Sequence, residues 1–211
     1  GRKFNALVHA GRDGYLWLLE RKADGIDFVD GRPYVNHDVI KGLEPKTGRP
    51  IYDESKMLKV GRTVTFCPSH WGGKDWPPTA YNPNTRLLFI PLQQNLCTTL
   101  VGEEKIAPYA AGKRYVGTDA AKTRVFPRDG ADHIGEVQAW DLDNNKLVWT
   151  YKFPDMNPNW GPLLATGGGL VFGGGSADRM FRALDAKTGK LLWQYKTSSG
   201  ITGVPSTYMV D

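Results

Sequence analysis

The sequence contains little cysteine, only two residues among 211, at positions 67 and 97. Neither residue belongs to a C-x-x-C pair or to a cysteine–histidine spacing, which excludes the usual zinc and dithiol motifs. Cys67 and Cys97 therefore form a disulfide or provide a reactive thiol. A thiol nucleophile would need a positioned base, and His70 follows Cys67 in a glycine-rich segment. The other histidines share no spacing typical of a metal site: His9, His37 and His133.

The sequence also lacks a long apolar run and a block of one charge. No stretch approaches the ~18 apolar residues that span a bilayer, so we expect no transmembrane helix. The net charge is +5, but the most basic stretch, Lys105 to Arg128, mixes basic with acidic residues. This mixture is typical of a solvated face and not of a nucleic-acid-binding surface. The chain shows no signal peptide and does not begin with methionine, so we expect a processed or partial chain.

Turn-forming and aromatic residues are abundant instead. The chain has 25 glycines, 14 prolines, 7 tryptophans and 9 tyrosines. Frequent glycine and proline indicate many turns, and aromatic residues favour strands that pack through their rings. The composition therefore predicts an all-β protein built from short strands.

Two segments of the chain align without gaps. Val137 to Phe153 reads VQAWDLDNNKLVWTYKF, and Phe181 to Thr197 reads FRALDAKTGKLLWQYKT. Trp149 matches Trp193 at an offset of 44 residues (193 − 149 = 44). Each copy predicts a β-hairpin, with an alternating strand, a turn tolerant of positive φ (Asn-Asn or Thr-Gly) and a second strand that carries tryptophan.

Weaker copies of this unit precede the two hairpins. Gly42 to Tyr52 carries the same Lys-Thr-Gly turn, and Ala6 to Lys22 has the strand–turn–strand pattern. Repeats of ~40–45 residues made of short strands are typical of β-propeller blades. We expect one partial β-propeller domain over residues 1–211, with about four blades of a larger ring, because the pattern starts and stops within a blade. Residues 98–129 are polar and aperiodic, and we expect an irregular insert there.

Four segments resemble the quinoprotein alcohol dehydrogenases, eight-bladed propellers that use pyrroloquinoline quinone (PQQ). The segments are HAGRDGYLWLLER (9–21), CPSHWGGKDWPPTAYNP (67–83), NWGPLLATGGGLVFGG (159–174) and the A-x-D-x-x-T-G-K-x-x-W unit at 183–193. The last one is similar to the tryptophan-docking motif of the family. All four follow the order of the family, and the resemblance implies that the chain corresponds to roughly the C-terminal third of such a subunit.

The resemblance implies an oxidoreductase that oxidises an alcohol or sugar hydroxyl by hydride transfer to PQQ. A Ca²⁺ ion or a lanthanide would polarise the quinone, and the electrons would pass to a cytochrome c-type acceptor. By the same resemblance, the metal ligands and the catalytic aspartate lie upstream of Gly1, in the N-terminal remainder of the propeller. This chain would then supply part of the cofactor pocket, hold no metal ligand and be inactive alone. The implied location is the periplasm.

The matching segments also imply residues that contact the cofactor. Arg12 matches a basic residue that points at the quinone carbonyls, where a fixed cation would stabilise developing negative charge. Asp75 and Trp76 match an Asn-Trp pair, and Trp160 matches a tryptophan of the cofactor or substrate chamber. From the residues alone, Arg12 could instead be a turn arginine paired with Asp13 in solvent, and Trp160 a ring of the propeller core.

Asp75 departs from the family pattern, which has asparagine at this position. An ionised Asp75 that faced the carboxylates of PQQ would be repelled by them. Three alternatives remain open: Asp75 turns to Lys74 or another cation, it binds the cofactor in the protonated form, or the site has diverged.

The resemblance further implies a Cys67–Cys97 disulfide, a bond that persists in an oxidising compartment. The chain-entropy model assigns about 3–4 kcal/mol to closing a loop of this length. We interpret the remaining tryptophans as structural, with the last two packed between blades: Trp71, Trp140, Trp149 and Trp193.

Two other classes of function stay open beside the dehydrogenase. A non-catalytic propeller scaffold that binds partner proteins would share the tryptophan-docking repeat, but it would need neither the two cysteines nor the GGKDW segment. A sensor propeller would bind the quinone or a sugar without turnover.

Overall fold

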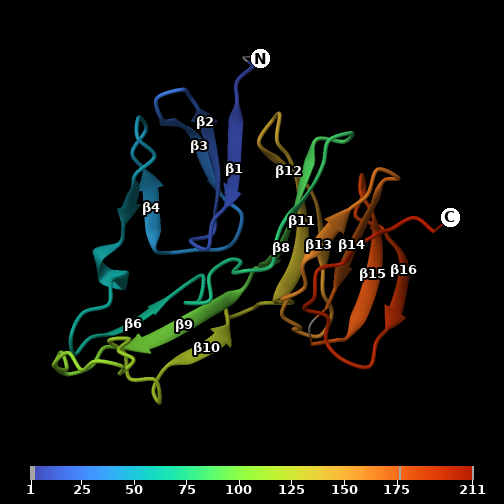
Figure 1. Cartoon of the computed structure of the whole chain (residues 1–211). Coiled ribbons are helices and arrows are strands. Elements are labelled where there is room, and N and C mark those ends of the chain that lie inside the picture. Colours follow the sequence, from blue (N-terminus) through green and yellow to red (C-terminus); the bar gives the residue numbers. More distant parts are fainter. Residues whose placement is uncertain (1–2, 176, 211) are drawn as a thin grey trace. The chain divides into compact units, whose positions relative to one another are not determined.

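A computed structural model describes residues 3–175 and 177–210, so the ends of the expected domain, Gly1 and Asp211, lie outside the described residues. The regular structure in these ranges is β-strand except for one turn of 3-10 helix, η1 (Glu54–Lys56) (Figure 1). The chain divides into two compact units, one from residues 1–72 and 96–129 and the other from residues 73–95 and 130–211. Each unit thus combines two separate segments of the sequence.

The first unit contains three antiparallel sheets. One sheet has the order β1-β2-β3 (Ala6–Ala10, Tyr15–Arg21, Ile26–Pro33). A second one pairs β4 with β5 (Ile40–Leu43, Pro50–Tyr52). The third has the order β10-β9-β6 (Arg124–Pro127, Leu96–Val101, Thr63–Phe66).

The second unit contains two four-stranded antiparallel sheets. The first has the order β12-β11-β8-β7 (Lys146–Lys152, Gly135–Asp141, Leu87–Gln93, Ala80–Asn82). The second has the order β13-β14-β15-β16 (Leu163–Ala165, Leu170–Gly174, Met180–Asp185, Leu191–Lys196). Strand β8 is buried at every position, which explains its continuous apolar sequence, because an inner strand is covered on both faces. These sheets confirm the all-β prediction.

The two aligned segments form the hairpins β11–β12 and β15–β16 (Figure 1). Both hairpins have a register shift at the same place, after Ala139 in the first and after Ala183 in the second, again 44 residues apart (183 − 139 = 44). The positive φ occurs where the repeat predicts it, at Asn145 with 46° and at Gly189 with 71°. The sequence repeat therefore reflects a structural repeat.

Trp149 joins the two sheets of the second unit. Its indole N–H donates to the carbonyl oxygen of Ala186 at 3.0 Å, in the turn between β15 and β16. Gly189 lies against its ring, and a Cβ atom at Gly189 would come within 2.6 Å of that ring. Trp149 belongs to a core shared by the two sheets, with Leu87, Phe89, Val137, Ala139, Phe153, Leu163, Val171, Leu184 and Ala186.

A similar contact lies in the first unit. Phe28 of β3 packs on Gly48 of the β4–β5 turn, and a Cβ atom at Gly48 would overlap the ring of Phe28. Gly48 has a positive φ of 68°. The weak third copy of the repeat is thus a real hairpin that receives an aromatic ring from the preceding sheet.

Two sequence expectations need correction. The irregular insert expected over residues 98–129 is shorter, because β9 extends to Val101 and β10 begins at Arg124. The segment between these strands forms only an isolated bridge, from Gly102 to Thr118. Trp193 was expected between blades, but it is 49% exposed and contacts Phe181 and Tyr195 of its own sheet. Trp149 lies on the corresponding edge strand β12 and is 9% exposed, because the β15–β16 turn covers it.

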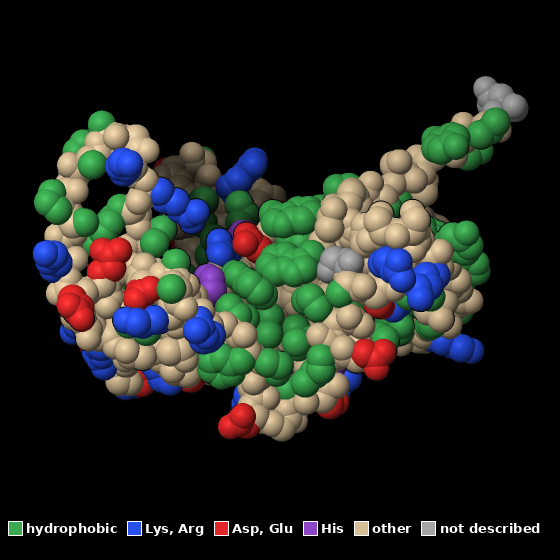
Figure 2. Space-filling view, turned by 90° about the horizontal axis from the view of Figure 1, so that it is seen from below, with side chains coloured by type: hydrophobic (Ala, Val, Ile, Leu, Met, Phe, Trp, Pro, Cys, Tyr) green, Lys and Arg blue, Asp and Glu red, His purple; other side chains and the backbone are tan. Residues whose placement is uncertain are grey.

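The surface carries mixed charge, and the described helices are too short to cross a membrane. On the face shown in Figure 2, lysine and arginine side chains are scattered, with acidic side chains among them. Within the described ranges, no helix has the length and apolar character of a membrane span.

We expect Gly189→Ala to lower the free energy of unfolding by about 3 kcal/mol, because the new methyl group meets the Trp149 ring and the backbone has a positive φ. Gly169→Ala is the matched control. Gly169 lies in the β13–β14 turn of the same sheet and has a φ of +83°, but no atom lies within 4 Å of a Cβ atom built there. That variant should lose only about 1–2 kcal/mol from backbone strain. Urea unfolding measures both losses, and equal losses would contradict the tryptophan contact.

Candidate functional site

The predicted site residues fall in both units. Arg12 belongs to the first unit, whereas Asp75, Trp76 and Trp160 belong to the second. Within the first unit, Arg12 lies near the disulfide segment through His70. Within the second unit, the loops that carry the other three residues both reach the end of β8, at Gln93.

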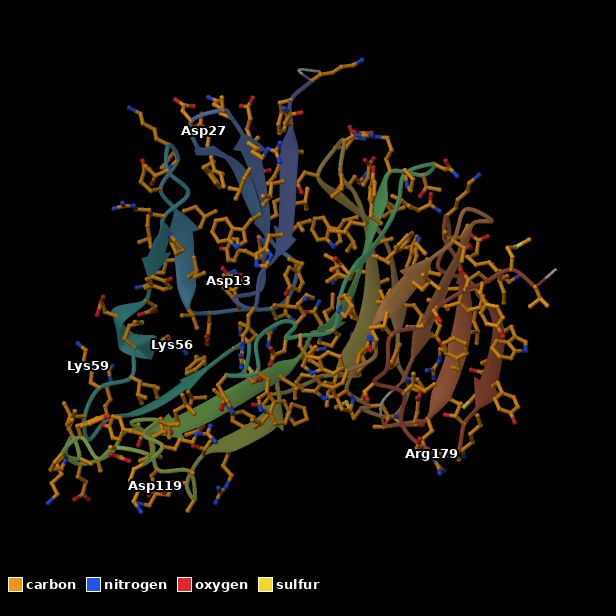
Figure 3. The ribbon with its side chains drawn as sticks, viewed as in Figure 1. Asp13, Asp27, Lys56, Lys59, Asp119 and Arg179 are labelled. Carbon is orange, nitrogen blue, oxygen red and sulfur yellow. A yellow bond between two sulfur atoms is a disulfide. The ribbon has the colours of Figure 1, made fainter. Side chains whose placement is uncertain are left out.

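Arg12 lies in a tight Gly-Arg-Asp-Gly turn between β1 and β2. The backbone N–H of Gly11 donates to the carbonyl oxygen of Tyr15 at 2.8 Å, and Gly14 has a φ of +89°, which favours glycine. Asp13, labelled in Figure 3 at the turn, accepts from the backbone N–H of Tyr15 at 3.0 Å. Its second carboxylate oxygen accepts from the indole N–H of Trp17 at 2.9 Å. The turn that carries Arg12 is therefore well ordered by its own residues.

Tyr34 holds the same turn from outside. Its hydroxyl donates to the carbonyl oxygen of Gly11 at 2.5 Å, and its backbone N–H donates to the carbonyl oxygen of Gly14 at 2.9 Å. Tyr34 is 3% exposed, so these bonds are shielded from water. The guanidinium of Arg12 donates to the carbonyl oxygen of His70 at 2.7 Å. This bond links the turn to the segment that follows Cys67.

The His70 side chain is also held in place. Its Nδ1 atom lies 3.0 Å from the hydroxyl oxygen of Thr98, which in turn donates to the carbonyl oxygen of Arg124 at 2.8 Å. Burial lowers the pKa of His70, and the positive charge of Arg12 lowers it further. His70 therefore favours the neutral form and supports Arg12 through its backbone rather than through charge.

Cys67 and Cys97 form a disulfide. Cys67 follows β6 directly and Cys97 lies within β9, and these strands pair with Phe66 opposite Thr98. Because both sulfur atoms are bonded to each other, a thiol nucleophile assisted by His70 is excluded in this oxidised chain.

A polar cavity of about 170 Å³ lies beside the disulfide, lined by Asn36, His37, Asp38, Cys67 and Arg128. Asp38 accepts from the backbone N–H of Cys67 at 2.9 Å and pairs with Lys56 at 2.7 Å. The Nδ1 atom of His37 is buried and has no hydrogen-bond partner among the described residues. Burial lowers the pKa of His37, although the nearby carboxylates of Asp38 and Asp13 oppose this shift. The cavity is thus suited to water or another small polar molecule.

Asp75 and Trp76 lie in the loop before β7. Trp76 is 54% exposed, so its ring is open to a ligand or to further protein. The ammonium group of Lys74 donates to the backbone carbonyl oxygen of Asp75 at 2.9 Å. Burial lowers the pKa of Lys74, and the Asp75 carboxylate partly offsets this effect. The Lys74 ammonium group thus lies close enough to Asp75 for the two charges to interact.

Trp160 lies in the loop before β13 and is half-buried. The residue before it, Asn159, is 2% exposed and makes hydrogen bonds with Gln93, Glu136 and Gly161. Gln93 and Asn159 were not predicted from the sequence. Two features of the sequence could have indicated them. Gln93 is an amide at the end of an apolar strand, and Asn159 is an amide immediately before Trp160.

A buried polar chain on β11 was also missed. Glu136, 2% exposed, accepts from the side chain of Gln138 at 2.5 Å and lies 2.6 Å from Nε2 of His133. Gln138 accepts from the indole N–H of Trp140 at 2.7 Å, and Asp132 lies 2.5 Å from Nδ1 of His133. Burial raises the pKa of Glu136, whereas Lys152 and His133 hold the pKa of Asp132 far below its ordinary value. The alternation Glu-Val-Gln-Ala-Trp placed these polar groups on one face of the strand.

Comparison with known proteins assigns the chain to a family. Residues 57–211 match the model described as glucose/ethanol/alcohol dehydrogenase, beta-propeller domain, with PQQ as its short name. The chain belongs to this family. The match contains the disulfide, the repeat hairpins and three of the four predicted cofactor contacts, and it leaves Arg12 outside.

Curated relatives agree with this assignment. The chain is 33% identical to quinoprotein ethanol dehydrogenase of Pseudomonas aeruginosa, over 100% of this chain and 33% of the relative. It is 35% identical to lanthanide-dependent methanol dehydrogenase of Methylacidiphilum fumariolicum, over 99% of this chain and 33% of the relative. The chain therefore spans about a third of the length of the curated relatives it matches.

Solved structures show the same fold. A europium-containing methanol dehydrogenase superposes with a TM-score of 0.84 and 33% identity, over 97% of this chain and 34% of that one. Quinohemoprotein alcohol dehydrogenase from Comamonas testosteroni gives a TM-score of 0.77 and 27% identity, over 98% of this chain and 30% of that one. The propeller-type fold of the family is thus shared by this chain.

Removal of the disulfide by the double substitution Cys67→Ser and Cys97→Ser should lower the free energy of unfolding by about 3–4 kcal/mol. The matched control is Thr65→Val with Thr99→Val, which removes the neighbouring cross-strand contact of 2.8 Å between the two hydroxyls but no covalent link. We expect about 1 kcal/mol or less for that pair. Denaturant unfolding with and without reductant measures both, and equal losses would contradict a stabilising crosslink.

Glu136→Gln should change how stability depends on pH. The folded pKa of Glu136 lies above its ordinary value of 4.5, so the folded state keeps this proton to higher pH than the unfolded state. The wild-type protein therefore loses stability relative to Glu136→Gln as the pH rises from about 4.5 through the raised pKa, by about 1.4 kcal/mol for each pKa unit of the rise. Unfolding at a series of pH values measures this difference, with the exposed Glu54→Gln as control. A difference that does not vary with pH would contradict the raised pKa.

Proposed function

We propose that the protein containing this chain is a PQQ-dependent alcohol dehydrogenase and that the chain supplies part of the cofactor pocket. The observation that carries this proposal is the match of residues 57–211 to the dehydrogenase propeller domain. Curated relatives named as quinoprotein ethanol dehydrogenase and lanthanide-dependent methanol dehydrogenase support the reaction class. The proposed reaction is oxidation of an alcohol or sugar hydroxyl to the carbonyl.

The donor set of the first unit fits a quinone. Arg12 is a permanent cation on a turn that Tyr34 and Asp13 hold in one conformation. A cation fixed before the ligand arrives stabilises negative charge on a quinone oxygen without a further reorganisation cost. When bound, PQQ supplies the redox centre that takes up the hydride of the alcohol. In this proposal, Arg12 binds and orients through charge and moves no proton.

The second unit would contribute flat apolar surface and polar edges. Trp76 is exposed enough to lie against a planar ring, and Trp160 stands on a loop fixed by buried amides. Each indole also offers one N–H donor. Asp75 does not fit a direct contact with the carboxylates of PQQ, and its nearness to Lys74 supports a role in balancing that ammonium group.

The remaining parts of the proposal concern groups outside this chain. A Ca²⁺ ion or a lanthanide would be held by residues of the N-terminal remainder of the propeller, which would also carry the catalytic aspartate. The electrons would pass to a cytochrome c-type acceptor. A periplasmic location is supported by the Cys67–Cys97 disulfide, because such bonds persist in oxidising compartments.

Reconstitution of the complete protein with PQQ tests the proposed function. The cofactor-free protein is incubated with PQQ and either Ca²⁺ or a lanthanide, and dye-linked oxidation is followed over a panel of alcohols and sugars. We expect the absorbance of bound PQQ and reduction of the dye with at least one alcohol. The absence of both over the whole panel would refute the dehydrogenase and leave a non-catalytic propeller.

Arg12→Gln should lower kcat of the reconstituted protein by about 100-fold, because the fixed positive charge is lost. The matched control is Arg32→Gln, since Arg32 lies in the same sheet, is exposed and pairs with Asp30 at 2.9 Å. Arg32→Gln should leave kcat unchanged. Steady-state kinetics of both variants checks the assignment, and equal values of kcat would contradict the electrostatic role of Arg12.

A further inference from the structure

Gln93, the last residue of β8, contacts both loops of the second unit that carry proposed quinone contacts. Its backbone N–H donates to the carbonyl oxygen of Gly73 at 2.7 Å, two residues before Asp75. Its side chain reaches Asn159, which immediately precedes Trp160. One residue thus joins the start of the GGKDW loop to the Trp160 loop.

The side chain of Gln93 binds both backbone polar groups of Asn159. Its Nε2 atom donates to the carbonyl oxygen of Asn159 at 2.8 Å, and its Oε1 atom accepts from the backbone N–H of Asn159 at 3.1 Å. Gln93 is 1% exposed and Asn159 is 2% exposed. A primary amide is the side-chain group that can donate to a carbonyl and accept from an N–H at the same residue. The pair therefore fixes the backbone before Trp160 as a strand pairing would.

Asn159 extends this restraint to the other side of Trp160. Its Nδ2 atom donates to the backbone carbonyl oxygen of Glu136 at 3.0 Å, and its Oδ1 atom accepts from the backbone N–H of Gly161 at 3.0 Å. The residues before and after Trp160 are thus both hydrogen-bonded to buried amides. These bonds hold the backbone on both sides of the indole ring.

Two close backbone contacts leave the loop no room to shift. A Cβ atom at Gly135 would lie 2.6 Å from the backbone N of Asn159, and one at Gly161 would overlap the carbonyl oxygen of Gly174. The loop therefore packs against β11 and β14 at distances that only glycine allows. Loss of the Gln93 amide would leave the N–H and the C=O of Asn159 without these partners in a buried place, which favours displacement of the loop.

We propose that Gln93 is a positioning residue: its side chain sets Trp160 for the quinone through Asn159, and its backbone N–H anchors the start of the GGKDW loop. This inference rests on the proposed function for the ligand, and it goes beyond that function in assigning a role to a residue that does not touch the ligand. Because small displacements at a binding site cost about 10- to 100-fold, we expect loss of the amide to act on the cofactor affinity.

The test compares Gln93→Ala with Asn82→Ala in the complete protein. Asn82 is the matched control: it is 2% exposed, lies in the same sheet and donates to the carbonyl oxygen of Thr166 at 3.0 Å, away from both loops. Hydrogen exchange of the cofactor-free protein and the Kd for PQQ are measured for both. We expect Gln93→Ala to speed amide exchange over residues 159–161 and to raise Kd about 10- to 100-fold. Asn82→Ala should lower the free energy of unfolding by a similar amount, but it should change neither the amide exchange of residues 159–161 nor the Kd for PQQ.

Gln93→Glu separates positioning from a simple packing role. The ionised glutamate can accept from the N–H of Asn159 but cannot donate to its carbonyl oxygen, whereas the protonated acid can do both. Relative to wild type at the same pH, the Kd of Gln93→Glu should therefore improve as the pH falls through the pKa of the new carboxyl group. Gln93→Ala should show no such recovery.

Different results would overturn different parts of the inference. An unchanged Kd and unchanged exchange in Gln93→Ala, or equal effects in Asn82→Ala, would refute the positioning role while PQQ still binds to the wild type. Wild-type protein that bound no PQQ would refute the proposed function and the quinone part of this inference. The exchange rates of the cofactor-free proteins would then still show whether Gln93 fixes the Trp160 loop.

Discussion

The second unit depends on the contact of Trp149 with the β15–β16 turn. The indole N–H binds Ala186, and the ring covers Gly189, so the position of one sheet is set by a turn of the next one. This contact aligns β8 and β11 with β13 and β14, because residues of all four strands meet in the core around Trp149. The Asp75–Trp76 loop leads into β7 of the first of these sheets, and the Trp160 loop connects β12 to β13. The site loops are thus positioned by packing that contains no site residue.

Polar side chains, in addition to the apolar core, hold the segments that carry the predicted cofactor contacts. Tyr34 and Asp13 fix the Arg12 turn in the first unit, while Gln93 and Asn159 fix the Trp160 loop in the second. In both places, side chains bind backbone atoms next to a predicted cofactor contact, and Tyr34, Gln93 and Asn159 are buried. Such bonds are costly to leave unmade in a buried place, so each one restricts the loop to a narrow set of conformations. These hydrogen bonds therefore hold the loops in place before a ligand binds.

Much of the fold could be predicted from local patterns, whereas the support of the site could not. The 44-residue offset predicted both hairpins, the positive φ at Gly189 and the tryptophan that docks on the next sheet. The partner of Asn159 could not be predicted, because Gln93 lies 66 residues earlier in the chain and no spacing rule connects two amides at such a distance. The exposure of Trp193 was also missed. Trp149 and Trp193 both lie on edge strands, and they differ in burial because the β15–β16 turn covers Trp149.

The sequence by itself determined the strand–turn repeats, the family resemblance and the residue types of the site, since turns, strand alternation and motif letters are local properties of the chain. Only the tertiary structure decided that Cys97 lies within β9, that the insert is bounded by β9 and β10, and that His70 supports Arg12 through its backbone. These features depend on contacts between residues far apart in the sequence. The chain alone specifies which groups are present, and the packing of the sheets specifies which of them meet.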